Sequence, residues 1–161
     1  MTDINDAKIV ETKIPPIRNG TVIDHITNGQ SLNVLKILGV NENNIDSVIS
    51  IGMHVPSVKT PGYKDVVKLE DRELDPNTVD KIALIAPNAT ISIIHDYYVA
   101  EKYAVKLGDR VKGIVKCSNP NCITNKNEPV DPEFDVEERN PPHLRCVYCG
   151  RILTDICDNL L

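Results

Sequence analysis

The sequence predicts an α+β protein in which a small cysteine-rich unit follows a larger unit of strands and helices. Apolar residues in the first two thirds of the chain alternate between strand and helix periods. Four of the five cysteines then form two close pairs, Cys117 with Cys122 and Cys146 with Cys149. A chain of 161 residues with 41% hydrophobic content is long enough for one ordinary domain or two small ones.

The first predicted elements are a strand and a helix. Residues 20–26 begin with a glycine and are rich in β-branched side chains, and the turn-forming residues 28–30 follow them. This pattern is typical of a strand. Apolar residues then recur at helical spacing up to Gly39, which we place as the C-terminal cap: Leu32, Leu35, Ile37 and Leu38. The chain therefore begins with a β-α unit.

A hairpin is expected next. Residues 48–55 and 64–70 have the alternation of strands, and residues 56–62 supply proline and glycine for the turn. Strict alternation in the first of these strands would place four apolar side chains on one face: Ile49, Ile51, Met53 and Val55.

The second helix has recognisable ends. Asp75 is a suitable N-cap, Pro76 suits the first helical position, and Pro87 forces a stop. Residues 89–96 and 97–103 then alternate as strands. The order β-α-β-β-α-β predicts a ferredoxin-like sheet with both helices on one face. Because a fold does not determine a function, the function must be inferred from sites.

The spacing of the four paired cysteines predicts a tetrahedral zinc site. Two short loops can each direct two thiolates at one ion, and four sulfurs about 2.3 Å from Zn²⁺ leave no open coordination position. The expected role is structural, since a segment of about fifty residues has too little interior to be held by apolar burial alone. We therefore expect two domains, residues 1–108 and a mostly β zinc domain of residues 109–161.

Two other interpretations of the cysteines are less favoured. Disulfides would require an oxidising compartment, but residues 1–6 are polar and acidic with no apolar signal segment behind them. A cytoplasmic location is therefore expected. A thioredoxin-like redox pair would leave the second cysteine pair without a role. Cys157 is left over, and its simplest interpretation is a small apolar residue.

Charge argues against nucleic acid as the partner. The net charge is −5, and both halves carry more acidic than basic residues, so neither offers a basic stripe for a phosphate backbone. The acidic segment 131–138 would repel phosphate. A zinc-ribbon nucleic-acid module remains the alternative interpretation. No apolar run approaches the roughly twenty residues of a membrane-spanning helix, so a soluble protein is expected.

The sequence shows no recognisable catalytic motif. The four histidines stand in no motif of a nucleophile with its base: His25, His54, His95 and His143. A metalloenzyme would need an open metal position, which four thiolates do not leave. Lys64 and Lys68 share a strand face, and Lys102 lies on a later strand. Converging cations would suit a polyphosphate, but spacing alone does not show that they converge.

Four segments together resemble the regulatory chain of aspartate carbamoyltransferase: Arg18-Asn19-Gly20-Thr21-Val22-Ile23-Asp24-His25-Ile26, residues 62–70, residues 86–90 and the two cysteine loops. The resemblance implies a non-catalytic allosteric subunit in pyrimidine biosynthesis. Its N-terminal domain would bind CTP or ATP, with UTP as a further candidate, and its zinc domain would contact the catalytic chain. In this family regulatory homodimers bridge two catalytic trimers, in a dodecamer with six chains of each kind.

The resemblance also implies which residues meet the nucleotide. His25, Lys68 and Lys102 would contact the phosphates, with Lys64 as a near neighbour, and Asp24 would accept a hydrogen bond from a sugar hydroxyl or a base amine. The base and ribose would be lined by Ile17, Val22, Ile94, Tyr97 and Val99.

Two departures from the family pattern bear on how the base is read. Ser92 stands where the family more often has asparagine, so a contact there would be lost or mediated by water. The pair Pro15-Pro16 precedes Ile17 and lacks backbone donors.

In the zinc domain, Asn119 and Asn121 would be presented to the catalytic chain, and Tyr148 could bury its ring at the same interface. The alternative for the asparagines is simple turn formation, which asparagine favours in such loops.

Overall fold

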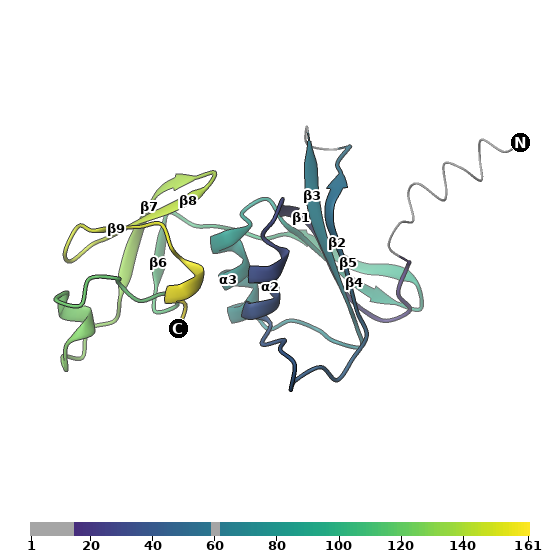
Figure 1. The fold of residues 1–161 in the computed structure, drawn as a ribbon, viewed down its shortest axis with the longest axis horizontal. Coiled ribbons are helices and arrows are strands. Elements are labelled where there is room, and N and C mark those ends of the chain that lie inside the picture. The colour runs from purple at the N-terminus through teal and green to yellow at the C-terminus, as the bar shows by residue number, and fades with distance from the viewer. Residues whose placement is uncertain (1–14, 59–61) are drawn as a thin grey trace, which may run out of the picture.

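A computed structural model describes residues 15–58 and 62–161. The N-terminal part is an antiparallel sheet in the order β2-β3-β1-β4-β5. Helices α2 (Ser31–Ile37) and α3 (Pro76–Ile85) both lie on one face of this sheet (Figure 1). The strands are β1 (Gly20–Thr27), β2 (Ile49–Pro56), β3 (Tyr63–Glu70), β4 (Thr90–His95) and β5 (Tyr98–Ala104). The predicted α+β class is confirmed.

The helix ends follow from local chemistry. The Asp75 side chain accepts a hydrogen bond of 2.7 Å from the Thr78 N–H, Pro76 opens α3, and the helix stops before Pro87, which cannot continue it. Helix α2 ends at Ile37 with Leu38 as its C-cap, one residue before the predicted Gly39, whose φ of +73° suits glycine and whose N–H donates to the Lys36 carbonyl.

The helix-covered face of the sheet holds the apolar core of this part. Ile23 and Ile26 of β1, Val67 and Leu69 of β3, and Ile91 of β4 are fully buried. They pack in one cluster with helix residues that are equally buried: Val34, Ile82 and Leu84. Removing these side chains from water is the main stabilising contribution of the sheet–helix contact.

Three β-bulges interrupt the regular alternation of side chains in the described part of the N-terminal sheet. In β1 one extra residue lies between Ile23 and Ile26, which pair with Val67 and Asp65 of β3, and the bulge includes His25 with a φ of +55°. Ile23 and Ile26 consequently both point to the helix face, although three positions separate them.

The bulge in β2 overturns one expectation from the sequence. Ile49 and Ile51 pair with Leu69 and Val67, on the helix side. The register then shifts between Gly52 and Val55, and Val55 pairs with Lys64 on the opposite side. The expected single face for Ile49, Ile51, Met53 and Val55 is therefore wrong at Val55, because one inserted residue reverses the side to which later residues point.

The C-terminal part is a small sheet in the order β6-β7-β8-β9. Its strands are β6 (Arg110–Lys112), β7 (Glu133–Arg139), β8 (Pro142–Cys146) and β9 (Ile152–Leu153), with short 3₁₀ turns η1 (Ile123–Asn125) and η2 (Cys157–Asn159). Phe134, the single phenylalanine of the chain, is fully buried at its centre. A helix fit to cross a bilayer is not found among the residues that the structure describes.

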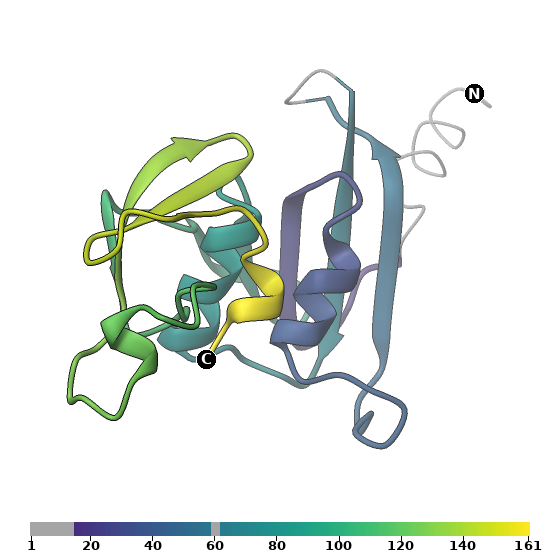
Figure 2. The ribbon, with the colours of Figure 1, turned by 60° about the vertical axis from the view of Figure 1, so that its left-hand side comes forward.

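The two parts share one contiguous apolar cluster. It runs from the sheet and helices through Val105, Val111 and Val115 to Phe134 and Ile156. The C-terminal segment lies against the helices (Figure 2), and Lys81 of α3 donates a hydrogen bond to the Leu161 carbonyl. Beside this contact, helix residues and the 140–142 turn line a cavity of about 430 Å³.

Gly20 provides a test of the sheet packing. Its φ is +139°, and a Cβ there would lie 2.0 Å from the Leu69 carbonyl oxygen. We expect Gly20→Ala to lower the free energy of unfolding by about 3 kcal/mol or more, because conformational strain and a backbone clash act together. The control is Gly113→Ala, with a φ of +76° and no atom within 4 Å of the added methyl group. Equal losses for the two variants in urea denaturation would contradict the packing described here.

Candidate binding face and metal centre

A row of four residues crosses the sheet on the face away from the helices. Val22 of β1 pairs with Lys68 of β3 on one side and with Ser92 of β4 on the other, and Ser92 pairs with Lys102 of β5. Residues directly opposite in an antiparallel ladder share a face. The two lysines therefore stand at the ends of the row. Their backbones are three strand spacings, or about 14 Å, apart across the sheet.

Apolar side chains line the same face next to this row. Ile94 pairs with Val99, and the bulge between Ile93 and Ile94 is what brings Val99 to the face that carries Lys102. Ser92 and Ile94 are buried, and Val99 is exposed. The face thus combines an apolar floor with cationic ends.

The remaining predicted lining residues, Ile17 and Tyr97, lie beside the face. Ile17 is buried, and two residues before it the Pro15 carbonyl accepts a 3.0 Å hydrogen bond from the Lys68 amine. Tyr97 stands in the β4–β5 turn with a largely exposed side chain, and its N–H donates to the Arg18 carbonyl at 2.9 Å.

The β1 bulge brings Asp24 and His25 together. Consecutive residues of a regular strand point to opposite faces, yet His25 Nε2 lies 3.9 Å from Asp24 Oδ2. Lys64 Nζ is 2.9 Å from Asp24 Oδ1, which also accepts from the His25 N–H at 2.6 Å. Asp24 and His25 lie within the strand, since β1 continues to Thr27.

The electrostatics of this face are set by burial and by ion pairing. Burial alone would raise the pKa of Asp24, but the hydrogen bonds from Lys64 and from the His25 N–H outweigh it, so the pKa lies below its ordinary value. For Lys68, burial lowers the pKa and the nearby Asp24 charge offsets this only in part. Asp24 is therefore ionised at neutral pH, and its charge interacts with both Lys64 and Lys68.

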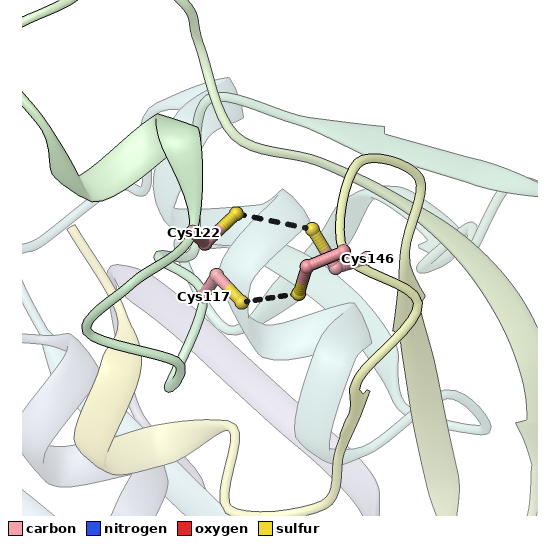
Figure 3. A group of neighbouring side chains, drawn as sticks. Cys117, Cys122 and Cys146 are labelled. Atoms are coloured by element: carbon pink, nitrogen blue, oxygen red, sulfur yellow. Dashed lines mark hydrogen bonds between the residues drawn. The ribbon is translucent and has the colours of Figure 1, made fainter.

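The four paired cysteines form the second candidate site. Their sulfur atoms all lie within 4.8 Å of one another. Figure 3 shows Cys117 and Cys122 directed from one loop toward Cys146 at the end of β8. The distances are 3.5 Å from Cys117 Sγ to Cys149 Sγ and 3.7 Å from Cys122 Sγ to Cys146 Sγ. Ligands at 2.3 Å in tetrahedral geometry would be about 3.8 Å apart, so the group fits one tetrahedrally coordinated metal ion.

Side-chain amides fix the first cysteine loop. The Asn125 amide donates to the carbonyls of Cys117 and Asn119, at 2.8 and 2.7 Å. Asn119 Oδ1 accepts from the Asn121 N–H at 3.0 Å, which is the turn-forming role that the sequence left open. Asn121 and Tyr148 have exposed side chains.

Asp65, which is not among the site residues predicted from the sequence, is the one fully buried carboxylate among the described residues. Its side chain accepts three backbone hydrogen bonds, from Gly29, Ser31 and His54. A signal was present in the sequence, because Asp65 alternates with Val67 and Leu69 on the apolar face of its strand, where a charge requires partners.

A sheet with helices on one face and a polar, cationic opposite face, joined to a four-cysteine cluster, is the arrangement of a two-part binding protein with a candidate ligand face and a candidate metal centre. The chain matches two family models, described as the allosteric domain of the aspartate carbamoyltransferase regulatory chain, over residues 12–106, and the metal binding domain of that chain, over residues 109–156. The chain belongs to the aspartate carbamoyltransferase regulatory chain family, and it is a regulatory, non-catalytic chain.

Three relatives carry the same description, aspartate carbamoyltransferase regulatory chain. Those of Thermoplasma volcanium, Methanothrix thermoacetophila and Methanocella arvoryzae are 54%, 56% and 55% identical to this chain. The alignments cover 89%, 90% and 94% of this chain and 93%, 93% and 97% of the relatives. The similarity therefore extends over both parts of the molecule.

The Asp24–Lys64 contact yields a direct test. We expect Lys64→Met to raise the pKa of Asp24, because the amine that stabilises the carboxylate is removed. The shift can be measured by NMR titration of the Asp24 carboxyl carbon. Lys112→Met, on β6, should leave that pKa unchanged. An Asp24 pKa unaffected by the loss of Lys64 would contradict the contact.

Proposed function

We propose that residues 1–108 bind a nucleoside triphosphate on the face described above, as the allosteric effector of an aspartate carbamoyltransferase. The observation that supports this most is the row Lys68–Val22–Ser92–Lys102, which sets two cations at the ends of a partly apolar strip. The effectors that we propose are CTP and ATP, with UTP as a further candidate.

In this proposal His25, Lys68 and Lys102 contact the phosphates and Lys64 strengthens the field, since ionised donors make the strongest hydrogen bonds to phosphate oxygens. Asp24 accepts from a sugar hydroxyl or a base amine. The other lining residues contact the base and ribose: Ile17, Val22, Ser92, Ile94, Tyr97 and Val99. Apolar walls with a few placed polar groups are typical of such sites.

We further propose that the metal is one structural Zn²⁺ per chain, bound by Cys117, Cys122, Cys146 and Cys149. The sulfur spacing supports a closed tetrahedral shell. The zinc domain, residues 109–161, would contact the catalytic chain through Asn121 and Tyr148. Asn119 would act there through the loop that it shapes.

The assembly that we propose contains six regulatory and six catalytic chains, with regulatory homodimers bridging catalytic trimers in the cytoplasm. The outer strands β2 and β5 pair on one side only within the described chain, and β2 exposes Ile51 and Met53, which suits contact with a second copy. The first six elements would form a ferredoxin-like unit to which β5 is added. Nucleotide binding would bias the catalytic trimers by a coupling free energy of about 1–3 kcal/mol.

Nucleotide binding is tested by calorimetry on the purified chain. We expect CTP or ATP to bind, and Lys68→Ala or Lys102→Ala to weaken binding about ten-fold or more, because each removes a charged donor. Lys112→Ala should bind like the unmodified chain, and all three variants should still associate with the catalytic chain. No binding at millimolar nucleotide would refute the proposal.

Metal dependence is tested separately. We expect Cys117→Ala to lose the metal, unfold the C-terminal domain and abolish association with the catalytic chain, because the metal stands in for a missing core. Elemental analysis and size-exclusion chromatography with the catalytic chain measure both effects. Cys157→Ala, which alters the cysteine outside the cluster, should retain metal and association. Assembly by a metal-free variant would rule out this role.

A further inference from the structure

The buried carboxylate of Asp65 connects two separate segments of the N-terminal part: the turn and helix start after β1, and strand β2. Oδ2 accepts hydrogen bonds from the N–H groups of Gly29 and Ser31, at 2.9 and 3.0 Å. Oδ1 accepts from the His54 N–H at 3.0 Å. The Ser31 bond satisfies the first N–H of α2, whose own N-cap residue makes no side-chain capping bond. A carboxylate from another strand therefore supplies the cap of this helix.

The position of Asp65 ties it to two of the three bulges. Its backbone pairs with Ile26, the first residue paired after the β1 bulge that contains His25. On the other side of β3, the β2 bulge contains His54, with a φ of +58°, whose N–H donates to Asp65. Left-handed backbone at a residue other than glycine persists only where the surroundings enforce it.

Lys64 and Asp65 hold the β1 bulge from opposite faces of the sheet. On the polar face Lys64 binds Asp24, immediately before His25. On the helix face Asp65 binds the backbone of Gly29 and Ser31, in the turn and helix that follow β1. The orientation of Asp24 and His25 thus depends on both residues, although Asp65 itself faces away from the proposed nucleotide.

We propose that Asp65 is a positioning residue of the effector face, and that its carboxylate couples this face to the edge strand β2 through the His54 N–H. This inference rests on the nucleotide binding proposed above. A nucleotide that contacts His25 would stiffen the β1 bulge and the turn that follows it. The Asp65 carboxylate, which binds the Gly29 and Ser31 N–H groups after β1, would transmit this restraint to the His54 N–H of β2. Strand β2 is the edge that we propose faces a second regulatory chain. Nucleotide binding would therefore be coupled through Asp65 to the contact between regulatory chains.

The first test is Asp65→Asn, which keeps the size and shape of the side chain but replaces one of its two acceptor oxygens with an NH₂ donor. If the remaining oxygen serves Gly29 and Ser31, the new NH₂ group faces the His54 N–H, a contact between two donors. We expect the dissociation constant for CTP to rise about ten-fold or more at a temperature where the variant is folded. The NMR signals of the His25 ring should also shift in the nucleotide-free variant. The control is Asp71→Asn, which removes an exposed charge next to β3. It should change neither the dissociation constant for CTP nor the NMR signals of the His25 ring.

The second test uses the unmodified chain and does not depend on how the variant folds. Saturating CTP should slow the hydrogen exchange of the Gly29, Ser31 and His54 amides about ten-fold. Exchange of these amides unaffected by CTP, or equal CTP affinity of the Asp65→Asn variant and the unmodified chain, would overturn the positioning role while leaving nucleotide binding intact. Failure of the unmodified chain to bind CTP would overturn the proposed function, and this inference with it.

Discussion

The confinement of four sulfur atoms within 4.8 Å is the constraint on which the C-terminal part depends. Burial raises the pKa of Cys117 to about 12 and also raises that of Cys146, whereas hydrogen bonds, led by that from the Arg151 N–H, outweigh burial and lower the pKa of Cys149 to about 7. A bound cation would favour the ionised form of all four thiols. The loops that carry them contain little regular structure, and the short strands of the small sheet enclose a small apolar interior: Val111, Phe134, Leu144 and Leu153. A bound metal would add to this part a stabilising contribution like the one that apolar burial makes in the larger sheet.

Hydrophobic periodicity and end signals located the strands and helices among the described N-terminal residues to within a few positions, because these elements follow local rules. The bulges could not be found in this way. The bulge in β2 moved Val55 to the other face of that strand, and the bulge in β5 brought Val99 onto the face of Lys102. The regular alternation of apolar residues does not indicate where one extra residue is inserted. The cysteine cluster was predictable from spacing alone. The convergence of the lysines was not, since it depends on the register between strands.

The polar face carries its own counter-charge. Asp24 holds Lys64 and influences Lys68, so the cations are partly neutralised before any anion arrives. A triphosphate would have to compete with this carboxylate for the same amines. The arrangement limits self-repulsion among the lysines in the unliganded protein. It also favours ligands that give Asp24 a donor in return, as a ribose or an amino-substituted base can do.

The apolar cluster that continues from the β-sheet through Val105 and Val115 to Phe134 and Ile156 has a thermodynamic consequence. Two parts that share buried surface do not melt independently, because unfolding one exposes the flank of the other. Loss of metal would then lower the thermal stability of the N-terminal part as well, and a ligand bound to either part would stabilise the other. In calorimetry the unfolding transitions of the two parts would be coupled, despite their two architectures.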